Sequence, residues 1–233
     1  MAKPSILLVH GAWHGSWCWE PLQSLLESRG HAVHALDHPT VHADNARELS
    51  LADDARGVQG AIDALVGDVI VVAHSYGGIP ATIGATSPRV RHIIYISAFV
   101  LDEGESLLQA VGGVKPDWWQ MDGTMVRPGN AQHPPQQLFY GDLEPARADA
   151  AAARLRPQAL KAFTDPVTAV AWRDRPTTYV LTEQDAVFPV QAQEALAARA
   201  GSTLHRLSTS HSPFLSQPDA VARIIESVVA RQA

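Results

Sequence analysis

The chain has 233 residues, a formal net charge of −6 and a sequence pI near 6.0. Its length suits one large α/β domain and leaves little for a second, and its hydrophobic fraction of 46% provides ample material for a core. No segment rich in Lys and Arg occurs that could displace the counterions of a nucleic-acid backbone. We therefore expect no nucleic-acid partner.

Cys18 is the only cysteine, which excludes an intramolecular disulfide, and its apolar neighbours favour a buried packing thiol over a reactive one. The first apolar run, residues 6–9, is too short for the core of a signal peptide or for a membrane span. We therefore expect a cytoplasmic protein without a membrane partner. Monomer and homodimer are both compatible with the sequence.

Short apolar segments without polar alternation recur along the chain. Such segments suit strands that are buried on both faces, as in a parallel sheet. They cover residues 6–9, 33–36, 69–73, 93–96, 177–181 and, more weakly, 203–207.

Helical patterns lie between these segments. Residues 190–200 are rich in Ala and Gln and end before Gly201, and Pro218 begins a closing helix that extends to about residue 229. The clearest apolar stripe consists of Leu51, Ala55, Val58, Ile62 and Leu65. This alternation predicts an α/β fold with a doubly wound, mostly parallel sheet, formed by a single domain over residues 1–233.

Residues 102–172 interrupt this alternation. The segment contains several prolines, the pair Trp118 and Trp119, and an Ala-rich helical pattern near residues 146–155, but no convincing strand. A segment of this length inside a compact domain usually has a functional role. We predict that it is an inserted lid over the ends of the strands.

A serine follows the third apolar segment, at the start of a helical stretch. Residues 69–78 read Val-Ile-Val-Val-Ala-His-Ser-Tyr-Gly-Gly, which matches the small-x-Ser-x-small pattern of a nucleophile elbow. Ala73 and Gly77 are small, as they must be where a strand and a helix cross. The pattern predicts Ser75 as a nucleophile exposed at the sheet edge. The alternative is a glycine-rich turn with an incidental serine.

The loop after the first apolar segment, residues 9–15, reads Val-His-Gly-Ala-Trp-His-Gly. A tetrahedral intermediate needs two preorganised N–H donors where its negative charge develops. We expect Tyr76, directly after the serine, to supply one donor and Ala12 to supply the other, with Trp13 as the alternative. Gly11 would allow the backbone to approach closely.

Several histidines of this region are spaced by four residues. Such spacing can hold a metal ion on a helix, but here a glycine-containing loop and Pro39 interrupt it. We therefore predict no metal site and assign these side chains to packing or loop hydrogen bonds. They are His10, His14, His34, His38 and His42.

A serine hydroxyl needs a base to take its proton. His211 lies in the segment Ser-His-Ser-Pro-Phe after the last strand pattern, where a base would follow the nucleophile and the acid in chain order, whereas His205 lies within that strand pattern. Asp185 is the predicted acid that orients the imidazole. Glu183 is the second candidate and Asp102 the third.

Four motifs together resemble the α/β-hydrolase superfamily: HGAWHGSWCW, AHSYGG, TEQDAVFP and SHSPFLSQP. More narrowly, the chain is similar to the branch of methylesterases, hydroxynitrile lyases and bacterial carboxylesterases of the pyrethroid-hydrolase kind. The resemblance spans nearly the whole core, but in the predicted lid only residues 139–157. It implies a sheet shortened at its first edge, since Ile6 begins what is usually the third strand.

The resemblance also separates the chemistries of this branch. Hydroxynitrile lyases of this type carry a threonine in place of Gly11 and a lysine in place of Ser212, and a haloalkane dehalogenase carries an aspartate in place of Ser75. It therefore implies a serine carboxylesterase that forms an acyl-enzyme on a small-molecule ester. No metal or organic cofactor is required.

Aromatic side chains of the predicted lid would favour a substrate with an apolar or aromatic part. The alternative is that the two tryptophans only fix the lid to the core. The residues expected to line the pocket are Gly11, Trp13, Tyr76, Trp118, Trp119 and Phe139.

Other functions are compatible with the same residues. The predicted triad could cleave C–C bonds, open lactones or act in polyketide tailoring, and this fold also supports cofactor-free dioxygenases. A different class is a ligand receptor that binds without turnover. Fold alone does not decide among them.

Overall fold

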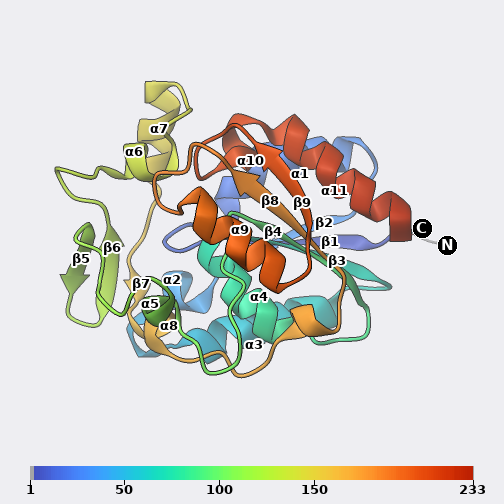
Figure 1. The fold of residues 1–233 in the computed structure, drawn as a ribbon, viewed down its shortest axis with the longest axis horizontal. Coiled ribbons are helices and arrows are strands. Elements are labelled where there is room, and N and C mark those ends of the chain that lie inside the picture. Colours follow the sequence, from blue (N-terminus) through green and yellow to red (C-terminus); the bar gives the residue numbers. More distant parts are fainter. Residues whose placement is uncertain (1–2, 233) are drawn as a thin grey trace.

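The computed structural model describes residues 3–232. Its centre is a six-stranded sheet in which all neighbouring strands are parallel (Figure 1). This confirms the doubly wound parallel sheet predicted from the sequence. In spatial order the strands are β2 (Val33–Leu36), β1 (Ser5–Val9), β3 (Val69–His74), β4 (Val90–Ile96), β8 (Thr177–Thr182) and β9 (Thr203–Leu207).

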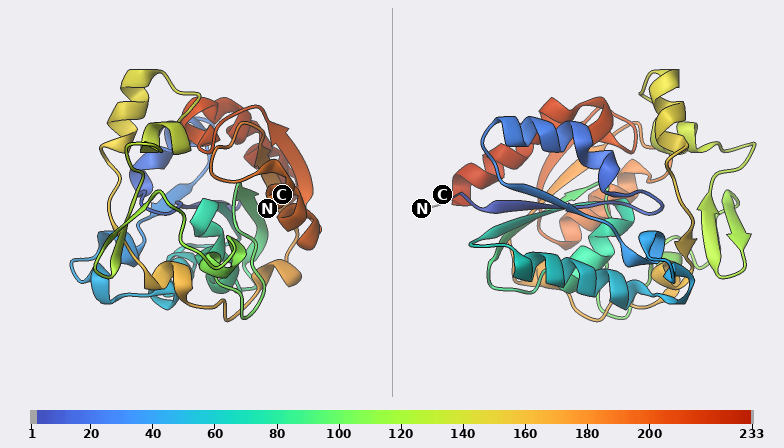
Figure 2. Two further views of the ribbon diagram at one scale, coloured as in Figure 1. Left: turned by 60° about the vertical axis from the view of Figure 1, so that its left-hand side comes forward. Right: turned by 180° about the vertical axis from the view of Figure 1, so that it is seen from behind.

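Helices cover both faces of this sheet, as the view from behind shows (Figure 2). One face packs against α1 (Glu20–Ser28), α10 (Pro213–Ser216) and α11 (Pro218–Gln232). The other face packs against α3 (Leu51–Ala64), α4 (Gly78–Gly84) and α9 (Val190–Arg199). The remaining short elements before β8 are η1 (Ser16–Trp19), α2 (Pro39–His42), η2 (Ala46–Glu48), η3 (Ser75–Gly77) and η4 (Ala171–Arg173).

The central strands show why their sequences lack alternation. In β1, Ile6 and Leu8 join the core beneath α1 and α11, while Leu7 and Val9 join the core beneath α3 and α4. Successive side chains of a strand point to opposite faces, so a strand covered on both sides is apolar throughout. Cys18 is also fully buried, which confirms the prediction of a packing thiol.

Residues 102–172, called the insertion below, contain a three-stranded antiparallel sheet, so the prediction of no strand in this segment was wrong. The strands are β5 (Trp119–Asp122), β6 (Met125–Pro128) and β7 (Gln158–Ala159). A two-residue turn joins β5 to β6, and Gly123 provides the positive φ of 60° that such turns require. The pattern was missed because β5 is mostly exposed and β7 has only two residues.

Four short helices complete the insertion, which lies beyond the carboxyl ends of the main strands (Figure 1). The helical pattern near residues 146–155 corresponds to α7. The four are α5 (Leu107–Ala110), α6 (Pro135–Phe139), α7 (Pro145–Ala152) and α8 (Lys161–Thr164).

No helix within residues 3–232 combines the length and the hydrophobicity that crossing a lipid bilayer would require.

Candidate active site

Ser75 lies at the sharp turn between β3 and α4. Its φ of 51° falls in the left-handed region that residues other than glycine rarely adopt. Strain of this kind in a strand-to-helix turn is typical of a nucleophile elbow and turns the serine side chain out of the sheet. The Ser75 carbonyl oxygen accepts a hydrogen bond of 3.1 Å from the Phe99 N–H, which helps to fix the turn.

The two glycines after the elbow are required by close backbone contacts. A Cβ atom at Gly77 would lie 2.3 Å from the His10 carbonyl oxygen, and one at Gly78 would lie 2.3 Å from the Phe99 carbonyl oxygen. Both contacts are with backbone atoms, so neither could be relieved by a side-chain movement. The turn therefore brings α4 directly against the loops that follow β1 and β4.

His211 and Asp185 are held together beside this elbow. Asp185 Oδ2 accepts a hydrogen bond of 2.7 Å from His211 Nδ1, and Ser75 and His211 line the same cavity. Both partners of the pair are almost completely buried. Because Nδ1 donates to the carboxylate, the lone pair of the neutral ring is on Nε2.

Further hydrogen bonds fix the Asp185 carboxylate. Thr182 Oγ1 donates to Oδ2 at 2.7 Å, and the N–H groups of Val187 and Phe188 donate to Oδ1, both at 2.8 Å. Burial alone would raise the pKa of Asp185, but the adjacent His211 and these donors outweigh it and hold the pKa below its usual value. The carboxyl group is therefore ionised at neutral pH.

The two other candidate acids lie elsewhere. The Glu183 side chain is exposed to solvent. Asp102 forms an ion pair with Arg173 near the surface. Neither has a hydrogen bond to His211 among the described residues.

The backbone of His211 is also anchored. Its carbonyl oxygen accepts hydrogen bonds from His74 Nε2 at 2.9 Å and from Ser97 Oγ at 3.2 Å. Burial, with a smaller contribution from nearby His211, lowers the pKa of His74 well below its usual value, so the ring is neutral. The ends of β3 and β4 thus position the loop that carries His211.

The loop after β1 is fixed at nearly every carbonyl. His38 Nε2 donates to the His10 carbonyl, and His42 Nε2 donates to the His14 carbonyl. Within the loop, His10 Nδ1 donates to the Gly11 carbonyl and His14 Nδ1 to the Ala12 carbonyl, both at 2.7 Å. These histidines therefore serve as loop hydrogen-bond donors.

The two candidate oxyanion donors of this loop differ in one respect. The Trp13 N–H is already bound, since it donates to Gln158 Oε1 at 3.0 Å. The Ala12 N–H has no hydrogen-bond acceptor within residues 3–232. Ala12 and Tyr76 both line the cavity that contains Ser75.

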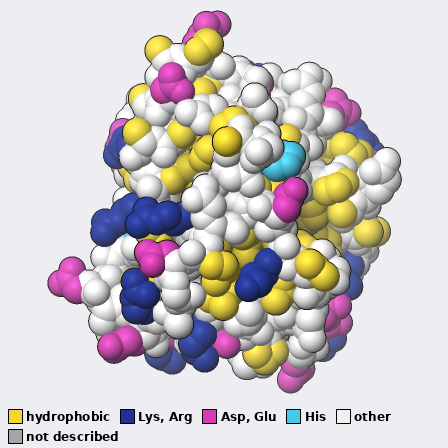
Figure 3. Space-filling model, turned by 90° about the vertical axis from the view of Figure 1, so that its left-hand side faces the viewer, with side chains coloured by type: hydrophobic (Ala, Val, Ile, Leu, Met, Phe, Trp, Pro, Cys, Tyr) yellow, Lys and Arg dark blue, Asp and Glu magenta, His cyan; other side chains and the backbone are white. Residues whose placement is uncertain are grey.

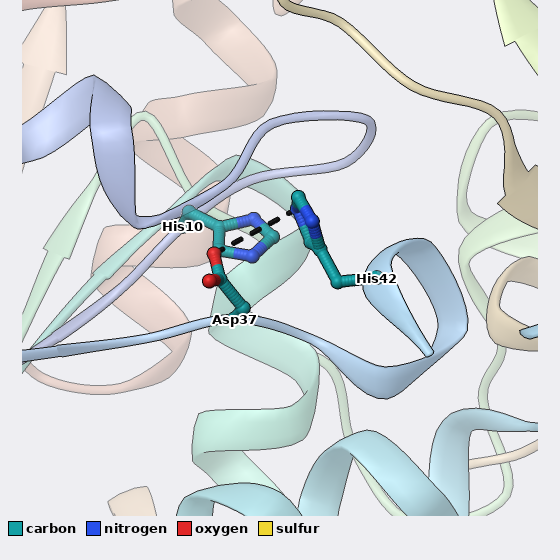
Figure 4. Close-up of side chains that lie close together, drawn as sticks. All are labelled: His10, Asp37 and His42. Carbon is teal, nitrogen blue, oxygen red and sulfur yellow. Dashed lines mark ion pairs between the residues drawn. The ribbon is translucent and has the colours of Figure 1, made fainter. Parts of the chain in front are cut away.

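His10, Asp37 and His42 come close enough to suggest a metal site, with ligand atoms within 4.8 Å of one another (Figure 4). The ring nitrogen atoms of the two histidines are not free to bind a metal ion. His10 Nδ1 donates to a carbonyl and Nε2 accepts from the His38 N–H. His42 Nε2 donates to a carbonyl, and Nδ1 faces Arg156 at 3.4 Å. No histidine lone pair in this cluster is available to a metal ion.

The cavity above Ser75 has a volume of about 360 Å³ and no Asp, Glu, Lys or Arg in its wall. The expected residues Trp13, Tyr76, Trp118, Trp119 and Phe139 all belong to the wall. Gly11 does not, because it packs beneath the elbow: a Cβ there would lie 2.7 Å from His74 Nδ1. Wall residues that the sequence did not suggest include Phe99, Leu107, Phe163, Val187 and Phe188.

Apolar side chains of the insertion also reach the surface. Val111 is part of the cavity wall, and Val111 and Met121 are each 40% exposed and Val114 is 74% exposed. Figure 3 views the molecule from the side of the insertion, where apolar side chains lie among basic and acidic ones. At Val111 the apolar wall of the cavity therefore continues to the surface.

The sequence profile of the alpha/beta hydrolase family matches residues 6–224. The chain belongs to this family. A carbendazim hydrolyzing esterase from Nocardioides sp. (strain SG-4G) is 38% identical over 110 residues, which cover 45% of this chain and 46% of that protein. The alpha/beta hydrolase nvfD of Aspergillus novofumigatus (strain IBT 16806) is 28% identical over 246 residues, covering 97% of each chain. This confirms the resemblance drawn from the sequence motifs.

A crystal structure of a pyrethroid hydrolase from Sphingobium faniae JZ-2 is similar to this α/β hydrolase over 98% of each chain, with a TM-score of 0.83 and 22% identity. At this identity the likeness shows a shared fold. The alignment with the carbendazim hydrolyzing esterase covers under half of that relative, whereas nvfD matches over nearly its whole length.

Two polar residues of this α/β hydrolase were missed from the sequence. Asp54 is fully buried on α3, and Gln158 is fully buried on β7. Asp54 had a signal, because it follows Leu51 by three residues and so lies on the apolar stripe of its helix. Gln158 had none, since its partners are distant in the sequence.

Proposed function

We propose that the chain is a serine carboxylesterase in which Ser75 is the nucleophile, His211 its general base and Asp185 the residue that orients His211. The observation that carries this proposal is the buried hydrogen bond of 2.7 Å between Asp185 and His211, together with the strained Ser75, which lines the same cavity as His211. A carboxylate, an imidazole and a serine in this order form the set that activates a hydroxyl for attack on a carbonyl.

The reaction proceeds in two stages. Ser75 Oγ attacks the ester carbonyl while His211 Nε2 takes its proton, and the tetrahedral intermediate collapses as His211 protonates the leaving alcohol. The acyl group remains on Ser75 as an ester. His211 then activates a water molecule that releases the acid and restores the serine.

The oxyanion of each intermediate accepts hydrogen bonds from the N–H groups of Tyr76 and Ala12. Tyr76 directly follows the nucleophile, where the first donor of this fold type lies. The bond between the Trp13 N–H and Gln158 supports Ala12 as the second donor, since Trp13 has no N–H to offer. The carbonyl hydrogen bonds that fix the loop reduce the reorganisation required during reaction.

The substrate is a small ester with an apolar or aromatic part. The cavity wall holds no charged side chain of Asp, Glu, Lys or Arg, so an ionised substrate group would be buried without a partner. One part of the wall is aromatic, where Trp13 lies near Trp118, Trp119, Phe139 and Phe163. Relatives named as carbendazim hydrolyzing and pyrethroid-hydrolysing enzymes are consistent with this class.

Gly11 and Ser212 support hydrolysis over hydroxynitrile cleavage. A side chain at position 11 would collide with His74 and approach Ser75 Cβ to 3.0 Å. No lysine follows His211 that could hold the charge of a cyanide leaving group. The insertion forms part of the cavity wall, which supports its assignment as a cover over the site.

We further expect the enzyme to act on free small molecules in the cytoplasm, as a monomer or homodimer and without a nucleic-acid or membrane partner. Light scattering coupled to size-exclusion chromatography measures the oligomeric state. A larger assembly would contradict this expectation.

The test is hydrolysis of p-nitrophenyl butyrate by the wild type and by Ser75→Ala and His211→Ala. Removing either group should lower kcat by more than about a thousandfold, because the two act as a unit. Matched controls are Ser24→Ala and His34→Ala, which alter an exposed serine and an exposed histidine and should keep wild-type rates. A folded wild type that releases no p-nitrophenol would contradict the proposed function.

A further inference from the structure

Gln158 connects the insertion to the loop that carries Ala12. The side chain is fully buried, and both ends of its amide are bound. Its Oε1 accepts from the Trp13 N–H at 3.0 Å, and its Nε2 donates to Thr40 Oγ1 at 3.0 Å. An amide with both ends bound in the interior has one orientation only.

The connection continues to the residue after the nucleophile. Thr40 Oγ1 donates to Asp54 Oδ2 at 2.6 Å, and the Thr40 N–H donates to Asp54 Oδ1 at 3.0 Å. Tyr76 Oη donates to the same Oδ2 at 2.6 Å. Thr40, Asp54 and Tyr76 are all buried. A continuous chain of hydrogen bonds thus joins Trp13 to Tyr76.

The two ends of this chain are the two backbone segments that form the proposed oxyanion hole. Trp13 directly follows Ala12, and Tyr76 carries the other donor. No step of the reaction requires Gln158, Thr40 or Asp54 to touch the substrate, and none of the three lines the cavity. Buried polar groups are costly unless they are fully paired, so a chain of them that serves only packing could be replaced by apolar residues.

We propose that Gln158 is a positioning residue for the oxyanion hole, acting with Thr40 and Asp54 to set the spacing between the N–H groups of Ala12 and Tyr76. This inference rests on the proposed function, because the hole has a role only if an oxyanion forms. Gln158, a residue of the insertion, would thus support catalysis without touching the substrate.

Two further contacts of Trp13 point in the same direction. Trp13 Nε1 donates to the Val126 carbonyl at 2.9 Å, and the Trp13 carbonyl accepts from the Arg156 N–H at 2.9 Å. The insertion therefore holds this residue at its side chain and at both of its backbone polar groups. Trp13 itself has a positive φ of 63°, a conformation that such external contacts must maintain.

The primary test compares Gln158→Leu with the wild type on p-nitrophenyl acetate. Removing one oxyanion donor outright typically lowers kcat by about a hundredfold or more, so displacing a donor should lower it by about tenfold. KM should stay within about twofold, because Gln158 does not touch the cavity and the Trp13 side chain, which does, keeps its own hydrogen bond to the Val126 carbonyl. Gln136→Leu is the matched control: it removes a glutamine hydrogen bond to Asp149 within the insertion and should keep the wild-type kcat.

Thr40 provides a second variant that does not depend on the folding of Gln158→Leu. Thr40→Val removes the hydroxyl with little change of shape and should lower kcat as Gln158→Leu does. Thr40→Ser keeps the hydroxyl and should therefore keep kcat near the wild-type value. Thermal melting of each variant separates this effect from loss of fold. A role in stability alone would lower the melting temperature and leave kcat of the folded enzyme unchanged.

The double variant Gln158→Leu with Tyr76→Phe tests whether the chain acts as one unit. If it does, the double variant should be no slower than the slower single variant, because either change already breaks the connection. Effects that multiply would overturn the inference, as would a wild-type kcat in folded Gln158→Leu. A wild type without esterase activity would overturn the proposed function itself, and this inference with it.

Discussion

Asp185 Oδ2 lies 2.7 Å from His211 Nδ1, and the Asp185 side chain is entirely shielded from solvent. The carboxylate also accepts bonds from Thr182, Val187 and Phe188, so its direction is set by four donors, one from the end of β8 and three from the loops after β8 and β9. In the proposed mechanism, a buried acid that is fixed in this way holds the imidazole in one tautomer and stabilises the imidazolium formed during attack.

Asp185→Asn should therefore lower kcat strongly, by about a thousandfold or more, because the amide can donate to His211 and favour the wrong tautomer. The change is nearly isosteric, so the fold should persist. Glu183→Gln alters the neighbouring exposed carboxylate and should keep wild-type kinetics. If Asp185→Asn kept full activity and Glu183→Gln lost it, the assignment of the acid would be reversed.

Gly11→Ala should destabilise the protein by about 1–3 kcal/mol and lower kcat, because the added Cβ would lie 2.7 Å from His74 Nδ1 and force the ring away from the elbow. Gly60→Ala is the opposite case. Gly60 lies within α3, and no atom beyond its own helix backbone lies within 4 Å of the place that a Cβ would take, so the change should stabilise the fold by about 0.5–1 kcal/mol. Urea denaturation measures both, and equal effects would contradict the packing role of Gly11.

Stability should depend on pH through buried neutral histidines. Burial lowers the pKa of His14 and His92 from 6.5 to about 4, and lowers the pKa of His10, His38 and His74 as well. Between pH 6.5 and about pH 4 the unfolded chain binds protons that the folded chain does not, so stability falls as pH falls through this window. For His14 alone the shift corresponds to about 3 kcal/mol.

The measurement is the urea midpoint at a series of pH values from about 7 to about 5. His92→Gln removes one of these groups far from the cavity and should reduce the slope, whereas His34→Gln alters an exposed histidine and should leave it unchanged. A midpoint independent of pH across this range would rule out neutral buried histidines.

The wall without charges predicts a preference for neutral esters. p-Nitrophenyl butyrate should exceed the hemisuccinate ester in kcat/KM by about tenfold or more, because the carboxylate of the latter would be buried without a partner. Ala192→Lys places a cation on the wall from α9 and should narrow the difference. Equal kcat/KM values for the two esters in the wild type would contradict this prediction and would place the acyl part of the substrate in solvent.

The strands of the core could be predicted because each of them is marked by its own short stretch of sequence. Each residue of β1 and of β3 is buried, so burial on both faces leaves a plain apolar run in the sequence. The insertion carries no such pattern: in β5 only Trp119 is buried, and β7 pairs with residues of β6 that are 32 and 34 positions earlier in the chain. Its strands depend on tertiary contacts that single-sequence periodicity does not contain.

The candidate site divides in the same way. Ser75 and His211 follow from motifs with a fixed place in the chain order, and Asp185 from its position after β8. The position of the Gln158 side chain depends on hydrogen-bond partners 145 and 118 residues away, so the residues next to Gln158 in the sequence give no sign of its role. Asp54 is intermediate: its place on the apolar stripe of α3 predicts burial, but its hydrogen-bond partners could not be predicted.

The contact between Trp13 and Gln158 also bears on how the enzyme becomes active during synthesis. The elbow at Ser75 and the backbone groups of His10 and Phe99 that contact it all lie within residues 10–99, but the Trp13 N–H finds its acceptor only after 145 further residues have been made. Contacts of such long sequence separation form late in folding, since a large loop must close first. We therefore expect the serine turn to form before the Ala12 loop is held in place, and we expect hydrolysis to await both the docking of β7 and the synthesis of His211, which follows Gln158 in the chain.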